Sequence, residues 1–257
     1  MEKKKEVTRI STEILGVDIG GSGIKGAPVN SASGKLLAER HRISTPNPAT
    51  PKSVARTLKQ LVDHFEWSGK IGCGFPSVIH KGIARTASNI DKKWIGVNVE
   101  KVFSAETGCL VAVVNDADAA GLAEMKFGVG KGRKGVVILV TIGTGIGTAI
   151  FVDGKLLPNT ELGHLVLKGE IAEHYASAAV LKRQKLTWEK WGKRVNRYLQ
   201  HLEFLFSPDL FILGGGVSKK FDLYKAYLQV DAEITPAALR NEAGIVGASL
   251  AAQLAGG

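Results

Sequence analysis

Residues 15–26 read LGVDIGGSGIKG, and this stretch decides how the rest of the chain is interpreted. The mainly apolar run from Ile14 to Ile19 predicts a buried strand. The glycines between Gly20 and Gly23 predict a tight turn after it, because glycine adopts positive φ values and allows close backbone approach. Successive N–H groups in such a turn form a concavity that binds anions. The stretch therefore predicts a strand followed by a phosphate-binding turn.

Asp18 stands where the predicted strand gives way to the turn. A carboxylate in this position is suited to hold Mg²⁺, through a water molecule, beside a bound phosphate. The glycine spacing differs from the dinucleotide-binding pattern, and the Gly-Lys-Ser or Gly-Lys-Thr sequence of a P-loop does not follow. A purely structural hairpin turn is therefore the alternative interpretation of this stretch alone.

A second stretch, VILVTIGTGIGT at residues 137–148, repeats this pattern. It predicts another apolar strand, a turn rich in glycine and threonine, and a further strand that ends at Val152. Both stretches run on to the sequence GKLL, at residues 34–37 and 154–157. This weak internal duplication has a period far longer than that of a solenoid repeat. Two similar halves, each with a phosphate-binding hairpin, predict two domains that bind one phosphoryl donor between them.

The composition sets broad limits on the kind of protein. A length of 257 residues allows one large domain or two small ones. The net charge of +10 favours an anionic partner, whether nucleic acid, an anionic membrane or a polyanionic substrate. The sequence has no apolar run of about 20 residues, and the charged start MEKKKEVTR lacks a signal-peptide core. Cys73 and Cys109 are expected to be reduced core residues of a cytoplasmic protein.

The apolar strand predicted over Leu110–Val114 delivers Asn115 and Asp116 at its carboxyl end. Ligands of open α/β sheets bind at that end of the strands. A helix is expected over residues 117–127, so Asp116 falls at a strand-to-helix junction. Capping of that helix is the structural alternative for this carboxylate.

Three weaker candidates lie on loops and strand ends. Gly74-Phe75-Pro76 ends a short strand and either contacts a small ligand or forms a plain turn. Asn89 offers an amide to a polyol. Glu161 and His164 suit hydrogen bonds to vicinal hydroxyls, but such a pair is satisfied within the protein about as often.

The segment from Thr187 to Phe206 has the strongest helical pattern. Its predicted core face consists of Trp188, Trp191, Val195, Tyr198, Leu202 and Leu205. A basic face lies roughly opposite and consists of Lys190, Lys193, Arg194 and Arg197. This basic face is either solvated, or lies on a membrane or in a peptide groove, or forms a track for a long polyphosphate chain.

Together these motifs resemble the ROK family of bacterial sugar kinases, from Leu15 to Leu254. The resemblance implies a two-domain α/β protein of the actin-like, ribonuclease H-like fold, with the active site in a cleft between the domains. The implied domains are residues 1–114 and 115–243, with a C-terminal helix at 244–257 packing back on the first. A homodimer is the expected assembly.

The resemblance also implies a role for each motif. Asp116 would be the catalytic base that accepts the proton of the glucose C6 hydroxyl. Glucose would contact Gly74, Pro76, Asn89, Asn115, Asp116, Glu161, His164 and Glu173. Donor phosphates would contact Asp18, Gly20, Gly21, Ser22, Gly23, Lys25, Thr141, Gly143, Thr144, Gly145, Gly214, Gly215 and Gly216.

Two features set this chain apart within the family. Most members carry a Cys-rich zinc motif after the Glu-x-Gly-His sequence, whereas residues 168–175 read KGEIAEHY here, so no structural zinc is expected. Residues 188–209 and 236–241 resemble the branch of the family that uses polyphosphate. The implied reaction is phosphorylation of glucose by inorganic polyphosphate, with Mg²⁺ as cofactor and ATP as a further possible donor.

Three other functions are weighed against this one. The first is a sugar kinase that uses ATP alone. The second is a sugar-responsive repressor, which needs a helix-turn-helix domain before the first turn, where residues 1–13 are too few for three helices. The third is a nucleic-acid binder, for which the sequence offers charge but no recognisable module or aromatic stacking motif. Neither nucleic acid nor a membrane is therefore expected as a partner.

Overall fold

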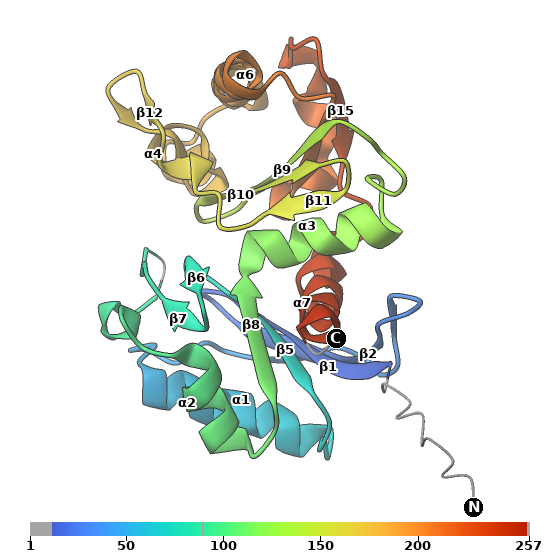
Figure 1. Ribbon diagram of the computed structural model, residues 1–257. Helices are drawn as coiled ribbons and strands as arrows, with labels where there is room; N and C mark the ends of the chain where they lie inside the picture. The colour runs from blue at the N-terminus through green and yellow to red at the C-terminus, as the bar shows by residue number, and fades with distance from the viewer. Residues whose placement is uncertain (1–11, 89, 256–257) are drawn as a thin grey trace, which may run out of the picture.

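Two sheets with the same strand order form the framework of the protein, and helices fill the space between them and cover their outer faces (Figure 1). This computed structural model describes residues 12–88 and 90–255. The charged tail at residues 1–11, the predicted ligand Asn89 and the last two residues lie outside the described residues.

The first sheet has the order β3-β2-β1-β5-β8. Its strands are β1 (Glu13–Ile19), β2 (Ile24–Asn30), β3 (Lys35–Leu36), β5 (Ile71–Phe75) and β8 (Val111–Asn115). The first three strands are antiparallel neighbours, while β5 and β8 run parallel to β1. The strand and the turn predicted from residues 15–26 are confirmed as β1 and the connection to β2.

The second sheet has the order β11-β10-β9-β14-β15. Its strands are β9 (Val136–Ile142), β10 (Ile146–Val152), β11 (Lys155–Leu157), β14 (Leu210–Gly214) and β15 (Glu233–Pro236). Again three antiparallel strands are followed by two parallel ones. The glycines of the two GKLL sequences, Gly34 and Gly154, both adopt left-handed φ values, of 72° and 80°. The predicted internal duplication is therefore confirmed in strand order and in this turn.

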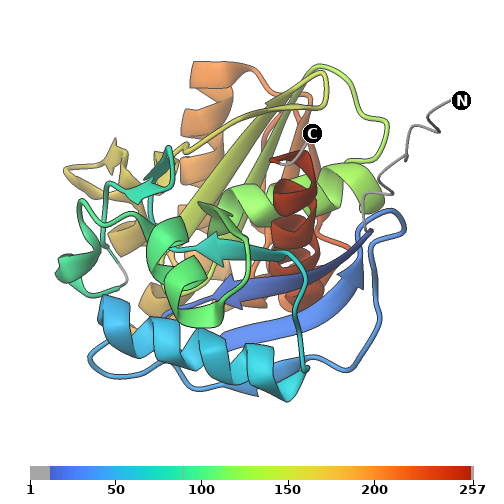
Figure 2. The same ribbon diagram turned by 60° about the horizontal axis from the view of Figure 1, so that its bottom comes forward.

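Five longer helices pack on the sheets (Figures 1 and 2). They are α1 (Pro51–His64), α2 (Val99–Thr107), α3 (Asp116–Phe127), α6 (Trp188–Phe206) and α7 (Ala243–Leu254). Helices α1 and α2 share a core with one face of the first sheet, and α6 shares a core with one face of the second. Helices α3 and α7 lie between the sheets and contact each other. The protein is thus built in five layers.

The remaining elements are short. They are β4 (His41–Ile43), which pairs with β2, the hairpins β6–β7 (Ile79–His80 and Ile83–Ala84) and β12–β13 (Val166–Leu167 and Glu170–Ile171), the helices α4 (Ala172–Ala176) and α5 (Ala178–Arg183), and the 3₁₀ helices η1 (Lys92–Trp94), η2 (Leu162–His164), η3 (Gly216–Leu223), η4 (Lys225–Tyr227) and η5 (Arg240–Glu242).

Helix α7 approaches the first sheet unusually closely. A β-carbon on Gly16 of β1 would overlap the carbonyl of Ile245, and one on Gly72 of β5 would overlap that of Ala248. The alternate residues of β1 and β5 are apolar and belong to the core that these strands share with α1 and α2. Because the two glycines lack side chains, α7 can lie directly on the strands.

Helix α6 follows the sequence prediction except at its end. Thr187 caps it by accepting a hydrogen bond from the amide of Lys190, at 3.2 Å. Trp191, Val195, Tyr198 and Leu202 are buried, as predicted. Leu205 was expected in the core and is 47% exposed, because it lies in the last turn, beyond Leu202, the final buried residue of the helix.

The predicted boundary between the two domains falls inside β8, whose last residue is Asn115. The segment over residues 243–254 returns to the first sheet as α7. The division of the chain into two domains stays a prediction. No helix among residues 12–88 and 90–255 is long and apolar enough to cross a membrane.

Candidate active site

A cavity of about 430 Å³ lies at the carboxyl end of β8, next to the turns after β1 and β9. Residues from both halves of the chain line it. It brings together most of the residues predicted from the sequence, namely Gly21, Ser22, Pro76, Asn115, Asp116, Thr141, Gly143, Thr144, Gly145, Glu161, His164, Glu173 and Gly215.

Asn115 and Asp116 divide the two roles that the sequence offered for them. Asn115 is the N-cap of α3, and its Oδ1 accepts hydrogen bonds from the amides of Ala117 (2.8 Å) and Asp118 (3.1 Å). Its Nδ2 donates to the carbonyl oxygen of Ser77 at 3.2 Å. Because Asn115 caps the helix, the carboxylate of Asp116 remains at the cavity wall.

The environment of Asp116 favours the protonated carboxyl. Burial, and then the negative charge of Asp18, raise its pKa to about 7, against a lowering effect of the hydrogen bond from the Ala117 amide. That bond measures 2.9 Å. A group with a pKa near neutral pH exchanges its proton readily under physiological conditions.

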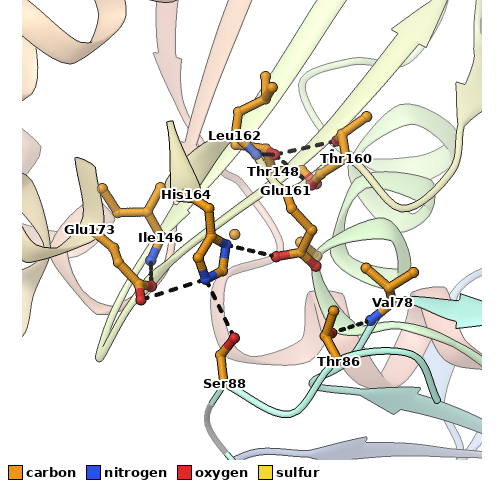
Figure 3. Close-up of polar contacts among 12 residues, drawn as sticks. Val78, Thr86, Ser88, Ile146, Thr148, Thr160, Glu161, Leu162, His164 and Glu173 are labelled. Carbon is orange, nitrogen blue, oxygen red and sulfur yellow. Dashed lines mark hydrogen bonds and ion pairs between the residues drawn. The ribbon is translucent and has the colours of Figure 1, made fainter. Parts of the chain in front are cut away.

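An imidazole and two carboxylates, those of His164, Glu161 and Glu173, lie close together in the lining of this cavity (Figure 3). The imidazole of His164 lies between two carboxylates, with Nδ1 3.3 Å from Oε2 of Glu161 and Nε2 3.9 Å from Oε1 of Glu173. Nε2 is also 3.3 Å from the hydroxyl of Ser88. Burial raises the pKa of Glu161, although His164 lowers it in part. Such converging donors and acceptors suit a ligand with several hydroxyl groups.

A smaller cavity of about 230 Å³ also has Asp116 in its lining. Among the predicted phosphate ligands, Asp18, Lys25, Thr141, Gly214, Gly215 and Gly216 line it. Nζ of Lys25 lies 3.1 Å from Oδ2 of Asp18. Asp116, Thr141 and Gly215 line both cavities, so the cavity around His164 and the cavity with the ion pair adjoin at the Asp116 carboxylate.

Some predicted residues lie outside both cavities. The amide of Gly20 donates to the carbonyl of Gly23 at 3.1 Å, and this bond closes the first turn. Gly74 lies in β5 beneath α3, where an added β-carbon would be 3.6 Å from Cα of Asp116. Gly20, Gly23 and Gly74 line neither cavity.

The glycines of the two turns were predicted to adopt positive φ values, and this prediction was wrong for three of them. Gly20, Gly23 and Gly143 do not adopt left-handed φ values. A β-carbon on Gly23 would instead collide with the guanidinium of Arg42, while one on Gly143 would meet no atom of the described residues within 4 Å. Glycine at 143 therefore leaves open space at the cavity wall.

The basic face of α6 lies away from both cavities. Lys193 pairs with Glu189, with Nζ and Oε1 2.6 Å apart. Arg194 donates to the carbonyl oxygen of Tyr175 at 3.1 Å, and Arg197 donates to the hydroxyl of the same tyrosine at 2.6 Å. The polyphosphate track over Lys190, Lys193, Arg194 and Arg197 stays a prediction.

Sequence reasoning missed several hydroxyl side chains of the larger cavity, namely Thr86, Ser88, Thr148 and Thr160. The hydroxyl of Thr148 donates to the carbonyl of Thr160 at 2.7 Å and accepts from the amide of Leu162 at 3.1 Å, which fixes the loop that carries Glu161. The available signal was Thr148 itself, a hydroxyl residue within a mainly apolar strand; the structure shows it to be fully buried. Ser88 gave no comparable signal, because its partner is 76 residues away.

Within the part of the chain that the structure describes, no group of three or more His, Cys, Asp or Glu side chains is arranged to hold a metal ion. The expected absence of structural zinc stays a prediction. Asp18, Asp116 and Glu124 line the smaller cavity, and of these Asp18 lies in β1, next to the first turn.

Comparison with known proteins defines the class. Residues 14–185 match the ROK family model. A polyphosphate glucokinase of Mycobacterium tuberculosis (strain CDC 1551 / Oshkosh) is 48% identical over 238 residues, which cover 92% of this chain and 90% of that protein. The crystal structure of an inorganic polyphosphate/ATP-glucomannokinase from Arthrobacter sp. strain KM matches with a TM-score of 0.93 at 47% identity, covering 95% of this chain and 100% of that one.

A ROK family glucokinase from Streptomyces griseus, solved with glucose and AMPPNP, has the same fold, with a TM-score of 0.82 at 24% identity, covering 94% of this chain and 99% of that one. The two sheets and their helices therefore form a sugar-kinase fold of the actin-like, ribonuclease H-like class, as predicted. Within that class, this chain belongs to the ROK family.

Proposed function

We propose that this protein transfers the terminal phosphoryl group of inorganic polyphosphate to the C6 hydroxyl of glucose, with ATP as a second donor. The observation that carries the proposal is the position of Asp116, a carboxylate with a pKa of about 7 in the wall of a cavity that the two glycine-rich turns and the side chains around His164 also line. The names of the relatives at 48% and 47% identity support the choice of substrates.

Asp116 acts as the general base. A hydroxyl group is a poor nucleophile at neutral pH, so its proton must leave as the oxygen attacks. The C6 oxygen forms a bond to the terminal phosphorus, the bond from that phosphorus to the bridging oxygen breaks, and the Asp116 carboxylate accepts the hydroxyl proton. The products are glucose 6-phosphate and a polyphosphate shortened by one unit.

Glucose is held by the group of side chains around His164. Glu161 and Glu173 accept hydrogen bonds from sugar hydroxyls, and His164 presents a ring nitrogen to a hydroxyl between them. Their convergence in one cavity with Asp116 supports this assignment. Fixing the sugar in this way aligns its C6 hydroxyl with the base, which lowers the entropic part of the barrier.

The donor phosphates bind at the two turns, whose backbone N–H groups stabilise the charge on the phosphoryl oxygens. Mg²⁺ fits this region, because Asp18 lies next to the first turn and lines the same cavity as Asp116, whose pKa its negative charge raises. Mg²⁺ is usually bound by one or two carboxylates, waters and substrate phosphates. Asp18 would hold the ion through water, and when bound the ion would neutralise phosphate charge.

A direct assay tests this function. The purified protein is supplied with glucose and either polyphosphate or ATP, and glucose 6-phosphate is measured. We expect product with polyphosphate. If only ATP gave product, the protein would still be a sugar kinase, but polyphosphate would not be its donor. If neither donor gave product, the proposed kinase activity would be wrong.

Three further features belong to this proposal. We infer two domains, residues 1–114 and 115–243, that close on the substrates and exclude water, which otherwise competes as acceptor. We also infer a homodimer. A cytoplasmic location agrees with the state of Cys73 and Cys109, which are both buried and unbonded.

A further inference from the structure

A third cavity, of about 760 Å³, opens beside the second turn. It shares Gly143 and Thr144 with the cavity that contains Asp116, and it shares Gly216 with the cavity around Asp18. All three cavities therefore meet where the donor phosphates are proposed to bind. A donor longer than its terminal phosphates can continue from this point into the third cavity.

Three lysines line this cavity from two separate segments. Lys182 lies in α5, Lys185 lies two residues beyond its end, and Lys220 comes from η3 on the other side. All three side chains are exposed, and none of the described residues forms an ion pair with them. The described lining contains no Asp or Glu. The cavity is therefore positively charged and its cations are free to meet an anion.

The basic face of α6 differs in this respect. Lys193 is already paired with Glu189, and Arg194 and Arg197 are already bound to Tyr175. An anion that approached the two arginines would compete with these contacts. The unpaired lysines of the third cavity also share that cavity with Thr144 of the second turn, whereas the basic side chains of α6 line none of the three cavities.

We propose that polyphosphate runs from the second turn through this cavity over Lys182, Lys185 and Lys220; the inference rests on the proposed function. Each internal phosphate unit carries one negative charge, so an extended polyphosphate gains from every cation along its path and releases counterions when it binds. ATP ends after three phosphates and gains less from lysines further along. The three lysines thus favour polyphosphate over ATP.

The same cavity explains how a longer chain continues. Trp188, at the start of α6, lines the cavity together with the lysines. Lys190 follows two residues later on that helix. A polyphosphate that leaves the cavity on this side passes the first turn of α6, so the cavity lysines act on short and long chains, and the α6 residues act only on long ones.

The test is a triple variant, Lys182→Gln with Lys185→Gln and Lys220→Gln, compared with the wild type. We expect the KM for polyphosphate to rise roughly tenfold or more relative to the KM for ATP, a typical size for the removal of three exposed charges that each meet a phosphate. The slope of log KM for polyphosphate against log salt should fall by about 2, at roughly 0.7 for each phosphate that the variant no longer neutralises.

The control is a triple variant with the same change in charge, Lys131→Gln with Lys155→Gln and Lys219→Gln. These three lysines are exposed and line none of the cavities. Their removal should change the ratio of the polyphosphate KM to the ATP KM less than twofold. A rise in that ratio as large as in the cavity variant would show that net charge is responsible, and would overturn the proposal.

A second measurement needs no variant. Lysine acetylation of the wild-type protein, read by mass spectrometry, should slow at Lys182, Lys185 and Lys220 when polyphosphate is present, and stay unchanged at Lys131, Lys155 and Lys219. If a wild type that uses polyphosphate shows neither this protection nor a KM effect in the cavity variant, the chain takes another route and only this inference is wrong. A wild type that makes no product from polyphosphate overturns the proposed function and this inference with it.

Discussion

The hairpin β1–β2 and the hairpin β9–β10 occupy the same place in their sheets but carry different chemistry. In the first hairpin, the pair before the last one is Asp18 and Lys25, and their side chains form an ion pair at 3.1 Å. In the second, the corresponding residues are Thr141 opposite Gly147, and the threonine hydroxyl donates to the glycine carbonyl at 3.3 Å. The first hairpin is charged and the second is neutral.

The two turns also differ in length and openness. A bond from the Gly20 amide to the Gly23 carbonyl closes the first turn, while the second is one residue shorter and closes from Gly143 to Gly145, at 3.0 Å. The difference teaches that one backbone pattern serves two electrostatic purposes. In the proposed function both turns offer backbone N–H groups to phosphate, and the first hairpin adds the Asp18 carboxylate, which would hold a cation.

The largest effect is expected at Asp116, where the two halves meet. Asp116→Asn removes the proposed base and keeps the side-chain shape, so kcat should fall roughly 10²–10⁴-fold. Steady-state kinetics with saturating glucose measure this loss. Asp222→Asn, which changes an 84% exposed carboxylate on η3, is the matched control. Near-normal turnover in a folded Asp116→Asn protein would show that another group accepts the proton.

The next effect separates function from packing within the second turn. Gly143→Ala adds a methyl group that meets no atom of the described protein within 4 Å, so the melting temperature should hardly change. The methyl group would stand in the space of the donor, and kcat/KM for polyphosphate should fall about 10²-fold, as misplacement by 1 Å does elsewhere.

Gly147→Ala is the contrasting variant in that hairpin. Its β-carbon would lie 2.7 Å from the hydroxyl oxygen of Thr141 and 2.9 Å from the β-carbon of Ala117, so the protein should lose about 1–3 kcal/mol of stability. If Gly143→Ala proved as destabilising as Gly147→Ala, the open space at Gly143 would not be a donor site.

The comparison between Asp18 and Thr141 predicts a smaller effect on the metal. Asp18→Asn should raise the Mg²⁺ concentration needed for half-maximal activity about 10-fold, within the range found for residues that act on a metal through another ligand. Thr141→Val, at the equivalent strand position, should leave the Mg²⁺ requirement unchanged. A titration of activity against Mg²⁺ compares them, and equal requirements in both variants would remove Asp18 from the metal site.

The smallest effect concerns stability against pH. Burial is the main cause that raises the pKa values of Asp116 and Asp118 to about 7 in the folded protein, against about 3.9 when unfolded. Between pH 4 and pH 7 the folded protein therefore holds protons that the unfolded chain has released. The stability that these two groups contribute is complete below pH 4 and is lost as the pH rises to about 7. The melting temperature should fall between pH 5 and pH 8, by about 2–4 °C for each kcal/mol of stability lost.

Asp116→Asn should flatten this dependence, whereas Asp222→Asn should not, because the second carboxylate is exposed. Scanning calorimetry at both pH values makes the comparison. An unchanged slope in Asp116→Asn would indicate that other groups cause the pH dependence.

The sequence was most informative where the pattern is local. The apolar runs before both glycine turns predicted β1 and β9, and the Asn115–Asp116 pair at a strand end predicted the junction between β8 and α3, because a buried strand and a capped helix each have their own periodicity. Glu161 and His164 were predicted to bind hydroxyl groups, with a pair satisfied within the protein as the alternative, and their side chains lie 3.3 Å apart.

The sequence was least informative where distant segments meet. Ser88 reaches His164 across 76 residues, and Lys220 joins Lys182 only because η3 packs opposite α5, so no spacing along the chain signals either contact. Leu205 fitted the helical period of α6, but periodicity does not reveal where the neighbouring sheet ends. Such features depend on tertiary packing.

The close seat of α7 on the first sheet has a consequence for biosynthesis. Residues 243–254 cover a face of β1 and β5 that is translated more than 170 residues earlier, counted from Gly72 to Ala243. In a nascent chain this face, with Gly16 and Gly72, therefore stays uncovered while the second half is synthesised. The first half can acquire its native layers only after the last helix emerges, so its protease resistance should appear late in ribosome-bound chains of increasing length.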